Sequence, residues 1–167
     1  VLDPASGFDG IRDVGIREGT IVALSETPLR GNKILDATGL VVAPGFIDPH
    51  IHFPQLQVIA SWGAQLLDWL NTYTFPEEAR FADPDHATRM AGLFLDQLTA
   101  HGTTTAVAFC SSHKTSADAL FTAAHDRDMA MVAGKVMMDR NAPDAVLDTA
   151  QQGYDDTRAL IRDWHGK

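Results

Sequence analysis

The stretch GFIDPHIH, residues 45 to 52, decides how this chain is expected to fold. It is apolar enough for a strand that is buried on both faces, as the strands of a parallel sheet are. Residues two apart on a strand point to the same side, so His50 and His52 are expected to project together while Ile51 faces the other way. Two imidazoles placed in this way can converge on one Zn²⁺ ion. Two hydrogen-bonded histidines in a polar pocket are the alternative, and the tripeptide alone leaves both open.

After this stretch, apolar strands alternate with amphipathic helices. Further strands are expected at 103–109 and 129–138. The first helix is expected to begin at Asp83, an N-cap that Pro84 follows at the first helical position, and to stop at Gly102. Two more helices are expected at about 116–126 and 148–164. The side chains expected to face the core are Met90, Ala91, Phe94, Leu98, Ala117, Leu120, Phe121, Ala124, Tyr154, Leu160, Ile161 and Trp164.

This alternation predicts an α/β fold, as the opening of either a doubly wound sheet or a (β/α)₈ barrel. About three β/α units are present, too few to complete either architecture. A closed barrel takes about 250 residues, whereas this chain has 167. The barrel interpretation therefore predicts a fragment of a larger protein.

Residues 1 to 43 show a different pattern of short strands and turns. DVGI at 13–16, the turn REG at 17–19 and TIVALS at 20–25 predict a hairpin, and KILDATGLVVAP at 33–44 is expected to add a further strand. The pattern predicts a small antiparallel β unit ahead of the α/β part.

Composition and charge exclude several classes of function. The formal net charge of -9, from 22 acidic and 13 basic side chains, argues against binding nucleic acid through its phosphates. The single cysteine, Cys110, excludes an intramolecular disulfide and a thiolate zinc knuckle, and it is compatible with a reducing, cytoplasmic location. The apolar runs are far shorter than the roughly 18 residues of a membrane span, so no membrane partner is expected.

Several blocks of the sequence, taken together, resemble one family. VVAPGFIDPHIH is similar to the first barrel strand of the amidohydrolase superfamily and the β segment before it. PQLQVIASWGAQLLDWLNTYTFPEEARF, HGTTTAVAF and GKVMMDRNAP then follow in the order found in the guanine deaminase branch of that superfamily. The resemblance implies that residues 44–167 are the N-terminal part of a metal-dependent hydrolase TIM barrel, and that 1–43 are part of a small N-terminal β-sandwich domain.

The same resemblance assigns roles to individual residues. It makes His50 and His52 ligands of one Zn²⁺ per chain and places Gln55 against the purine, where its amide offers a donor and an acceptor to the lactam edge of guanine. Trp69 is expected either to stack on the purine or to pack its own helix with Leu66, Leu67 and Leu70. The implied substrate is guanine, the implied products are xanthine and ammonia, and the implied assembly is a homodimer.

No catalytic acid or base is expected within these residues. The resemblance places two further histidines, a glutamate and an aspartate on later barrel strands, and it gives Glu77 and Glu78, in the long loop after the first strand, no catalytic position. His113 is expected to be an ordinary loop histidine rather than a substrate contact. Lys135 is interpreted as structural, and Arg140 is expected to pair with an acid.

Other functions remain open at this point. One alternative is an aminohydrolase of the same superfamily that acts on a triazine, cytosine or an adenosyl compound; Gln55 and the WLNTYTFP block argue against it. Another is a non-catalytic scaffold on the same barrel, against which the two histidines argue. The unrelated deaminase fold with a PCxxC zinc motif is excluded because the chain has one cysteine.

Overall fold

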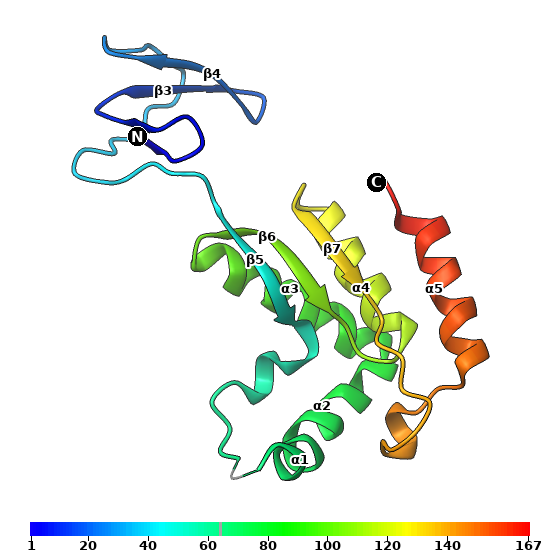
Figure 1. Ribbon diagram of the computed structural model, residues 1–167. Coiled ribbons are helices and arrows are strands. Elements are labelled where there is room, and N and C mark those ends of the chain that lie inside the picture. The colour runs from blue at the N-terminus through cyan, green and yellow to red at the C-terminus, as the bar shows by residue number, and fades with distance from the viewer. Residues whose placement is uncertain (64) are drawn as a thin grey trace. The chain divides into compact units, whose positions relative to one another are not determined.

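A computed structural model describes residues 1–63 and 65–167. The chain divides into two compact units, Val1–Gly45 and Phe46–Lys167; Figure 1 labels the helices and the strands β3 to β7. Among the described residues, none of the helices combines the length and the apolar character needed to cross a lipid bilayer.

The first unit consists of two small antiparallel pairs of strands. β1 (Leu2–Asp3) pairs with β2 (Phe8–Asp9), and β3 (Asp13–Arg17) pairs with β4 (Thr20–Ser25). Glu18 and Gly19 connect β3 to β4 with φ angles of 50° and 74°, the positive values that a two-residue type I′ hairpin requires. The predicted hairpin is therefore confirmed.

The expected strand at 33–44 is wrong. None of these residues is in a strand, and Ile34, Leu35 and Val41 are 77%, 84% and 77% exposed. A backbone hydrogen bond from Leu2 N to Val42 O, 2.8 Å long, joins the segment to the unit. An apolar run becomes a strand only when a neighbouring strand pairs with it and buries one face, and within the described residues this one has no such neighbour.

The second unit is built on a three-stranded parallel sheet. β5 (Phe46–His52), β6 (Thr103–Phe109) and β7 (Ala130–Gly134) lie in that order, which confirms three adjacent parallel strands. β7 is shorter than the predicted 129–138. After Gly134 the backbone bonds elsewhere, from Val136 N to Ser111 O and from Met138 N to the Asp148 side chain, so the apolar run leaves the ladder.

Three helices accompany the sheet: α3 (Pro84–Ala100), α4 (Lys114–His125) and α5 (Ala150–Trp164). The predicted start of α3 is confirmed, because the Asp83 side chain accepts a hydrogen bond from Asp85 N at 2.9 Å. The core forms between the helices and one face of the sheet, and it includes Met90, Phe94, Leu95, Leu98, Ala106, Ala108, Ala117, Leu120 and Leu160. Side chains on the other face of β6, such as Val107 and Phe109, are 36% and 40% exposed.

The predicted inner face of α5 is only half right. Leu160 is buried and Trp164 packs against the core, but Tyr154 and Ile161 are 55% and 57% exposed. Near the start of the helix, Gly153 lies against the segment that follows β7: an added Cβ would lie 3.2 Å from Asp148 Oδ2 and 3.3 Å from Met137 Cγ. The small residue that weakens the helix by propensity thus provides space for a close contact.

The segment between β5 and α3 is helical, where a long loop was expected. It contains a 3₁₀ turn, η1 (Phe53–Val58), then α1 (Leu66–Trp69), a π-helical turn, η2 (Leu70–Thr74), α2 (Phe75–Ala79), and a second 3₁₀ turn, η3 (Arg80–Ala82). Phe53 and Phe81 are fully buried with ring centroids 5.0 Å apart, and Phe94 of α3 lies 5.3 Å from Phe53. These rings fasten both ends of the segment to the core. Figure 1 shows α1 and α2 beyond the carboxyl end of β5.

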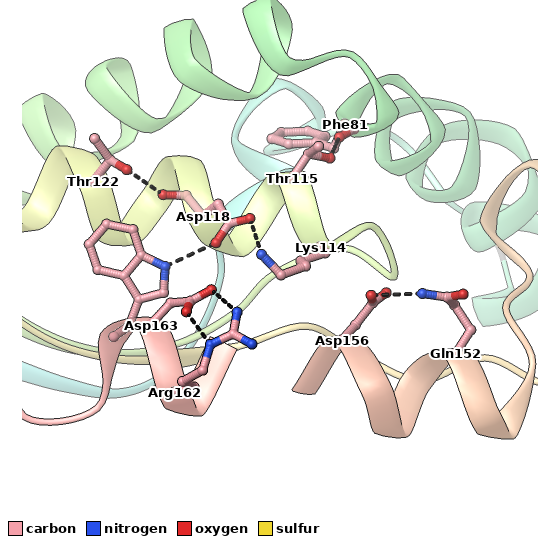
Figure 2. A network of polar contacts seen from close by, with 10 residues as sticks. Phe81, Lys114, Thr115, Asp118, Thr122, Gln152, Asp156, Arg162 and Asp163 are labelled. Carbon is pink, nitrogen blue, oxygen red and sulfur yellow. Dashed lines mark hydrogen bonds and ion pairs between the residues drawn. The ribbon is translucent and has the colours of Figure 1, made fainter. Parts of the chain in front are cut away.

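Polar contacts join α4 to its neighbours, as Figure 2 shows. The Asp118 carboxylate accepts hydrogen bonds from Lys114 Nζ at 2.6 Å and from the Trp164 indole Nε1 at 2.9 Å. Trp164 also stacks on Phe121, with ring centroids 5.6 Å apart, and Thr115 Oγ1 donates to the carbonyl of Phe81 at 2.5 Å. One carboxylate therefore connects the first turns of α4 with the end of α5.

Replacing Asp118 by alanine is expected to lower the free energy of unfolding by about 1 kcal/mol, because the partly buried indole N–H loses its acceptor. Asp126→Ala is the matched control, since this carboxylate is exposed after the end of α4. Thermal unfolding followed by circular dichroism measures both. Equal melting temperatures for the two variants would contradict the assignment.

Candidate functional site

His50 and His52 lie side by side at the carboxyl end of β5. Their Nε2 atoms are 3.3 Å apart and their ring centroids 5.3 Å apart, so the predicted common direction of the two side chains is confirmed. Phe109, which pairs with His52 across the sheet, has its ring centroid 5.1 Å from each imidazole. Sequence reasoning missed Phe109, although its place at the end of the next strand was a usable signal.

The separation of the two nitrogens suits a metal ion. Two nitrogens bound to tetrahedral zinc at about 2.0–2.1 Å lie roughly 3.3–3.4 Å apart. Partial burial, with a smaller contribution from His50, lowers the pKa of His52, which favours the neutral imidazole that binds metals. Among the described residues, no group of three or more His, Cys, Asp or Glu side chains could hold a metal. The pair alone offers two donors, fewer than the three protein ligands of a catalytic zinc site.

Gln55 lies directly beside His52. It is in η1, the turn that follows β5, and its amide Nε2 is 3.2 Å from His52 Nδ1. The same Nε2 donates to Glu78 Oε1 at 3.3 Å. Gln55 thus joins the histidine pair to α2 through one amide group.

A cavity of about 580 Å³ brings the four predicted site residues together. His50, His52, Gln55 and Trp69 all line it. It also extends along β5 to His101, the C-cap of α3, whose predicted helix-end position is confirmed. The volume is within the range of small-molecule pockets, about 300–1,000 Å³.

The position of Trp69 depends on the backbone at Gly63. A Cβ added at Gly63 would lie 2.6 Å from both Cβ and Cδ1 of Trp69, so the chain passes directly against this side chain. Of the three partners in the helix-packing alternative, Leu66 and Leu67 are 70% and 69% exposed and Leu70 is half-buried. Trp69 is half-buried and lines the cavity.

Two buried carboxylates in α2 are the main feature that sequence reasoning missed. Glu77 and Glu78 are 7% and 4% exposed. Arg80 Nη1 pairs with Glu77 Oε2 at 2.6 Å, and His86 Nε2 lies 3.2 Å from Glu77 Oε1. Burial raises the pKa of Glu78, and the hydrogen bond from Gln55 opposes that shift. The sequence does contain a signal for this short helix: Pro76 is followed by two acidic residues, which is typical of a helix start. Phe75 and Phe81 flank these acids on either side.

The other polar residues considered from sequence lie away from the histidine pair. His113 precedes α4 and lines a second cavity of about 320 Å³, together with Lys114 and Asp148. Burial lowers the pKa of His113. Lys135 forms a buried ion pair with Asp148, which supports its structural interpretation. Arg140 pairs with Asp139, Nε to Oδ1, at 3.0 Å, as predicted.

Cys110 takes no part in the site. It is buried directly after β6, and burial raises the pKa of its thiol to about 12. A thiol in this state is neither a metal ligand nor a nucleophile near neutral pH.

Comparison with known proteins identifies the family. The sequence profile of the Amidohydrolase family matches residues 41–166. The chain belongs to the amidohydrolase family. It is 50% identical over 133 residues to guanine deaminase of Escherichia coli, covering 80% of this chain and 30% of that protein. It is 43% identical over 135 residues to a probable guanine deaminase of Deinococcus radiodurans, covering 81% and 31%.

A solved structure of this family is also similar. Guanine deaminase from C. acetobutylicum, with guanine bound in its active site, superposes with a TM-score of 0.76 at 32% identity, covering 92% of this chain and 38% of that one. The present chain of the amidohydrolase family therefore spans about a third of the length of the relatives that it matches.

Gly63→Ala is expected to displace Trp69 from the cavity wall and to lower the free energy of unfolding by about 1–3 kcal/mol, as overpacking does. Tryptophan emission measures the displacement once the other two indoles, Trp62 and Trp164, are replaced by phenylalanine. Gly92→Ala is the control, because Arg127 Nη2, 3.8 Å away, is the nearest neighbour of an added Cβ there. An unchanged spectrum in the Gly63 variant would refute the contact.

Proposed function

We propose that this chain is part of a guanine deaminase, an enzyme that hydrolyses guanine to xanthine and ammonia. The observation that carries the proposal is the pair His50 and His52 beside Gln55 in one cavity, in a chain 50% identical to a guanine deaminase. A relative 43% identical is a probable guanine deaminase, and a similar solved structure contains guanine.

His50 and His52 would hold one Zn²⁺ per chain through their Nε2 atoms. Zinc would supply a water nucleophile at neutral pH, because it lowers the pKa of bound water to about 7. The two imidazoles are close enough to share an ion, and Phe109 restricts their movement from one side. Catalytic zinc takes three protein ligands, so the remaining ligands and the general acid and base would come from outside these 167 residues.

Gln55 and Trp69 would recognise the purine. The Gln55 amide lines the cavity beside the histidine pair, so it can hydrogen-bond the polar lactam edge of guanine. The Trp69 indole is flat and lines the same cavity, so it can stack on a planar ring. A polar and an aromatic contact in one cavity favour a flat, polar heterocycle as the substrate.

The fold and assembly of the whole protein belong to the same proposal. Residues 44–167 would form the first three β/α units of a (β/α)₈ barrel, and 1–43 would be part of a small β-sandwich domain. The parallel order β5, β6, β7 supports the barrel, since a barrel strand pairs in parallel with its neighbours. The whole enzyme would be a cytoplasmic homodimer, as the family resemblance implies.

The complete protein is expected to convert guanine to xanthine, measured by the change in ultraviolet absorbance and by ammonia release. His50→Ala and His52→Ala are each expected to lose zinc and to lower kcat by about a hundredfold or more, because metal catalysis contributes several kcal/mol. His125→Ala, an exposed histidine at the end of α4, is the control.

Two results would contradict this proposal. Turnover of a triazine or cytosine without turnover of guanine would assign another aminohydrolase activity. Full zinc content and activity in both histidine variants would show that His50 and His52 are not zinc ligands.

A further inference from the structure

Glu78 is a buried carboxylate with an unusual set of contacts. It is 4% exposed, and its Oε1 accepts a hydrogen bond from Gln55 Nε2 at 3.3 Å. Its Oε2 is also buried and has no hydrogen-bond partner in the part of the chain that the structure describes. Burying a carboxylate is costly unless it is paired and hydrogen-bonded.

The neighbouring glutamate shows what a structural carboxylate looks like in the same helix. Glu77 is buried to a similar degree, and its charge is balanced by Arg80 at 2.6 Å. Glu78 has no such ion pair among the described residues, and its hydrogen bond is to the amide of Gln55. The ion pair with Arg80 therefore accounts for the burial of Glu77. No ion pair among the described residues accounts for the burial of Glu78.

The contact with Glu78 fixes which way the Gln55 amide points. The end of the amide that faces Glu78 is the NH₂ group, which donates to Glu78 Oε1 at 3.3 Å. With Nε2 in this position, the carbonyl oxygen Oε1 is the end of Gln55 that is left for a ligand in the cavity it lines.

We propose that Glu78 is a positioning residue for substrate recognition: it holds the donor end of the Gln55 amide, so that Gln55 Oε1 accepts a hydrogen bond from an N–H group of the substrate. The identity of the substrate as guanine rests on the proposed function. The contact between Glu78 and Gln55 does not depend on which substrate the cavity binds.

Glu78→Leu removes the acceptor and lets the Gln55 amide rotate. In the complete protein, KM for guanine is expected to rise about tenfold, the loss of one well-oriented hydrogen bond, while kcat changes by less than about twofold. Glu78→Gln keeps an acceptor oxygen and the side-chain shape, so its KM is expected to stay within about threefold of the wild type. Glu78→Met replaces the leucine variant if the latter does not fold.

The matched control is Glu77→Leu, the adjacent buried glutamate, whose contacts are Arg80 and His86. It is expected to lower the melting temperature and to leave KM unchanged. A KM increase in Glu77→Leu as large as that in Glu78→Leu would overturn the proposal, because burial of any carboxylate in α2 would then explain both.

A double-mutant cycle with Gln55→Ala tests whether Glu78 acts through Gln55. The Glu78→Leu change is expected to raise KM less than about twofold when Gln55 is already absent. A tenfold increase in that background would overturn the proposal.

The same cycle on the midpoint of thermal unfolding does not need a substrate. If the wild type fails to deaminate guanine, the proposed function is refuted, and this cycle alone decides the Glu78 contact. Non-additive shifts of the midpoint support the contact, and additive shifts overturn it.

Discussion

The candidate site depends on the alternation of side chains along β5. Ile51 faces the helices and packs against the core, and this leaves His50 and His52 on the opposite face with their Nε2 atoms 3.3 Å apart. A slip of one residue in the register would send both imidazoles into the apolar core and bring Ile51 out. The pairing of Ile51 with Ala108 and of His52 with Phe109 prevents this slip. The core therefore determines the direction in which the two imidazoles point.

A second constraint comes from the helical segment that follows β5. Phe53 and Phe81 are fully buried at its two ends, and Gln55 and Glu78 lie between them in sequence. Because the aromatic contact fixes both ends, the two polar side chains meet although they are separated by 23 positions. Burial of aromatic rings is non-directional and strong, and here it holds a hydrogen bond that would be weak by itself. The Gln55–Glu78 contact and the histidine pair are in this way supported by the same small cluster.

Much of this arrangement could be predicted from the sequence. The apolar runs and the Asp83–Pro84 helix start are local signals, and the period of two in HIH is enough to place both imidazoles on one side. Pro76 indicates a helix start before Glu78, but the sequence does not show that this acid is buried, because the π-helical turn Leu70–Thr74 breaks the 3.6-residue period ahead of α2. The predicted strand at 33–44 and the predicted end of the strand at 129–138 are wrong for a related reason. An apolar run does not reveal whether a partner strand exists, and that depends on the tertiary structure.

Anomalous X-ray scattering at the zinc edge shows whether His50 and His52 share one zinc ion. In crystals of the complete protein grown with zinc, one anomalous peak per chain is expected within about 2.0–2.1 Å of both Nε2 atoms. A peak bound to other residues, with the two imidazoles still in contact with each other, would contradict a shared zinc ion. So would the absence of any peak near β5.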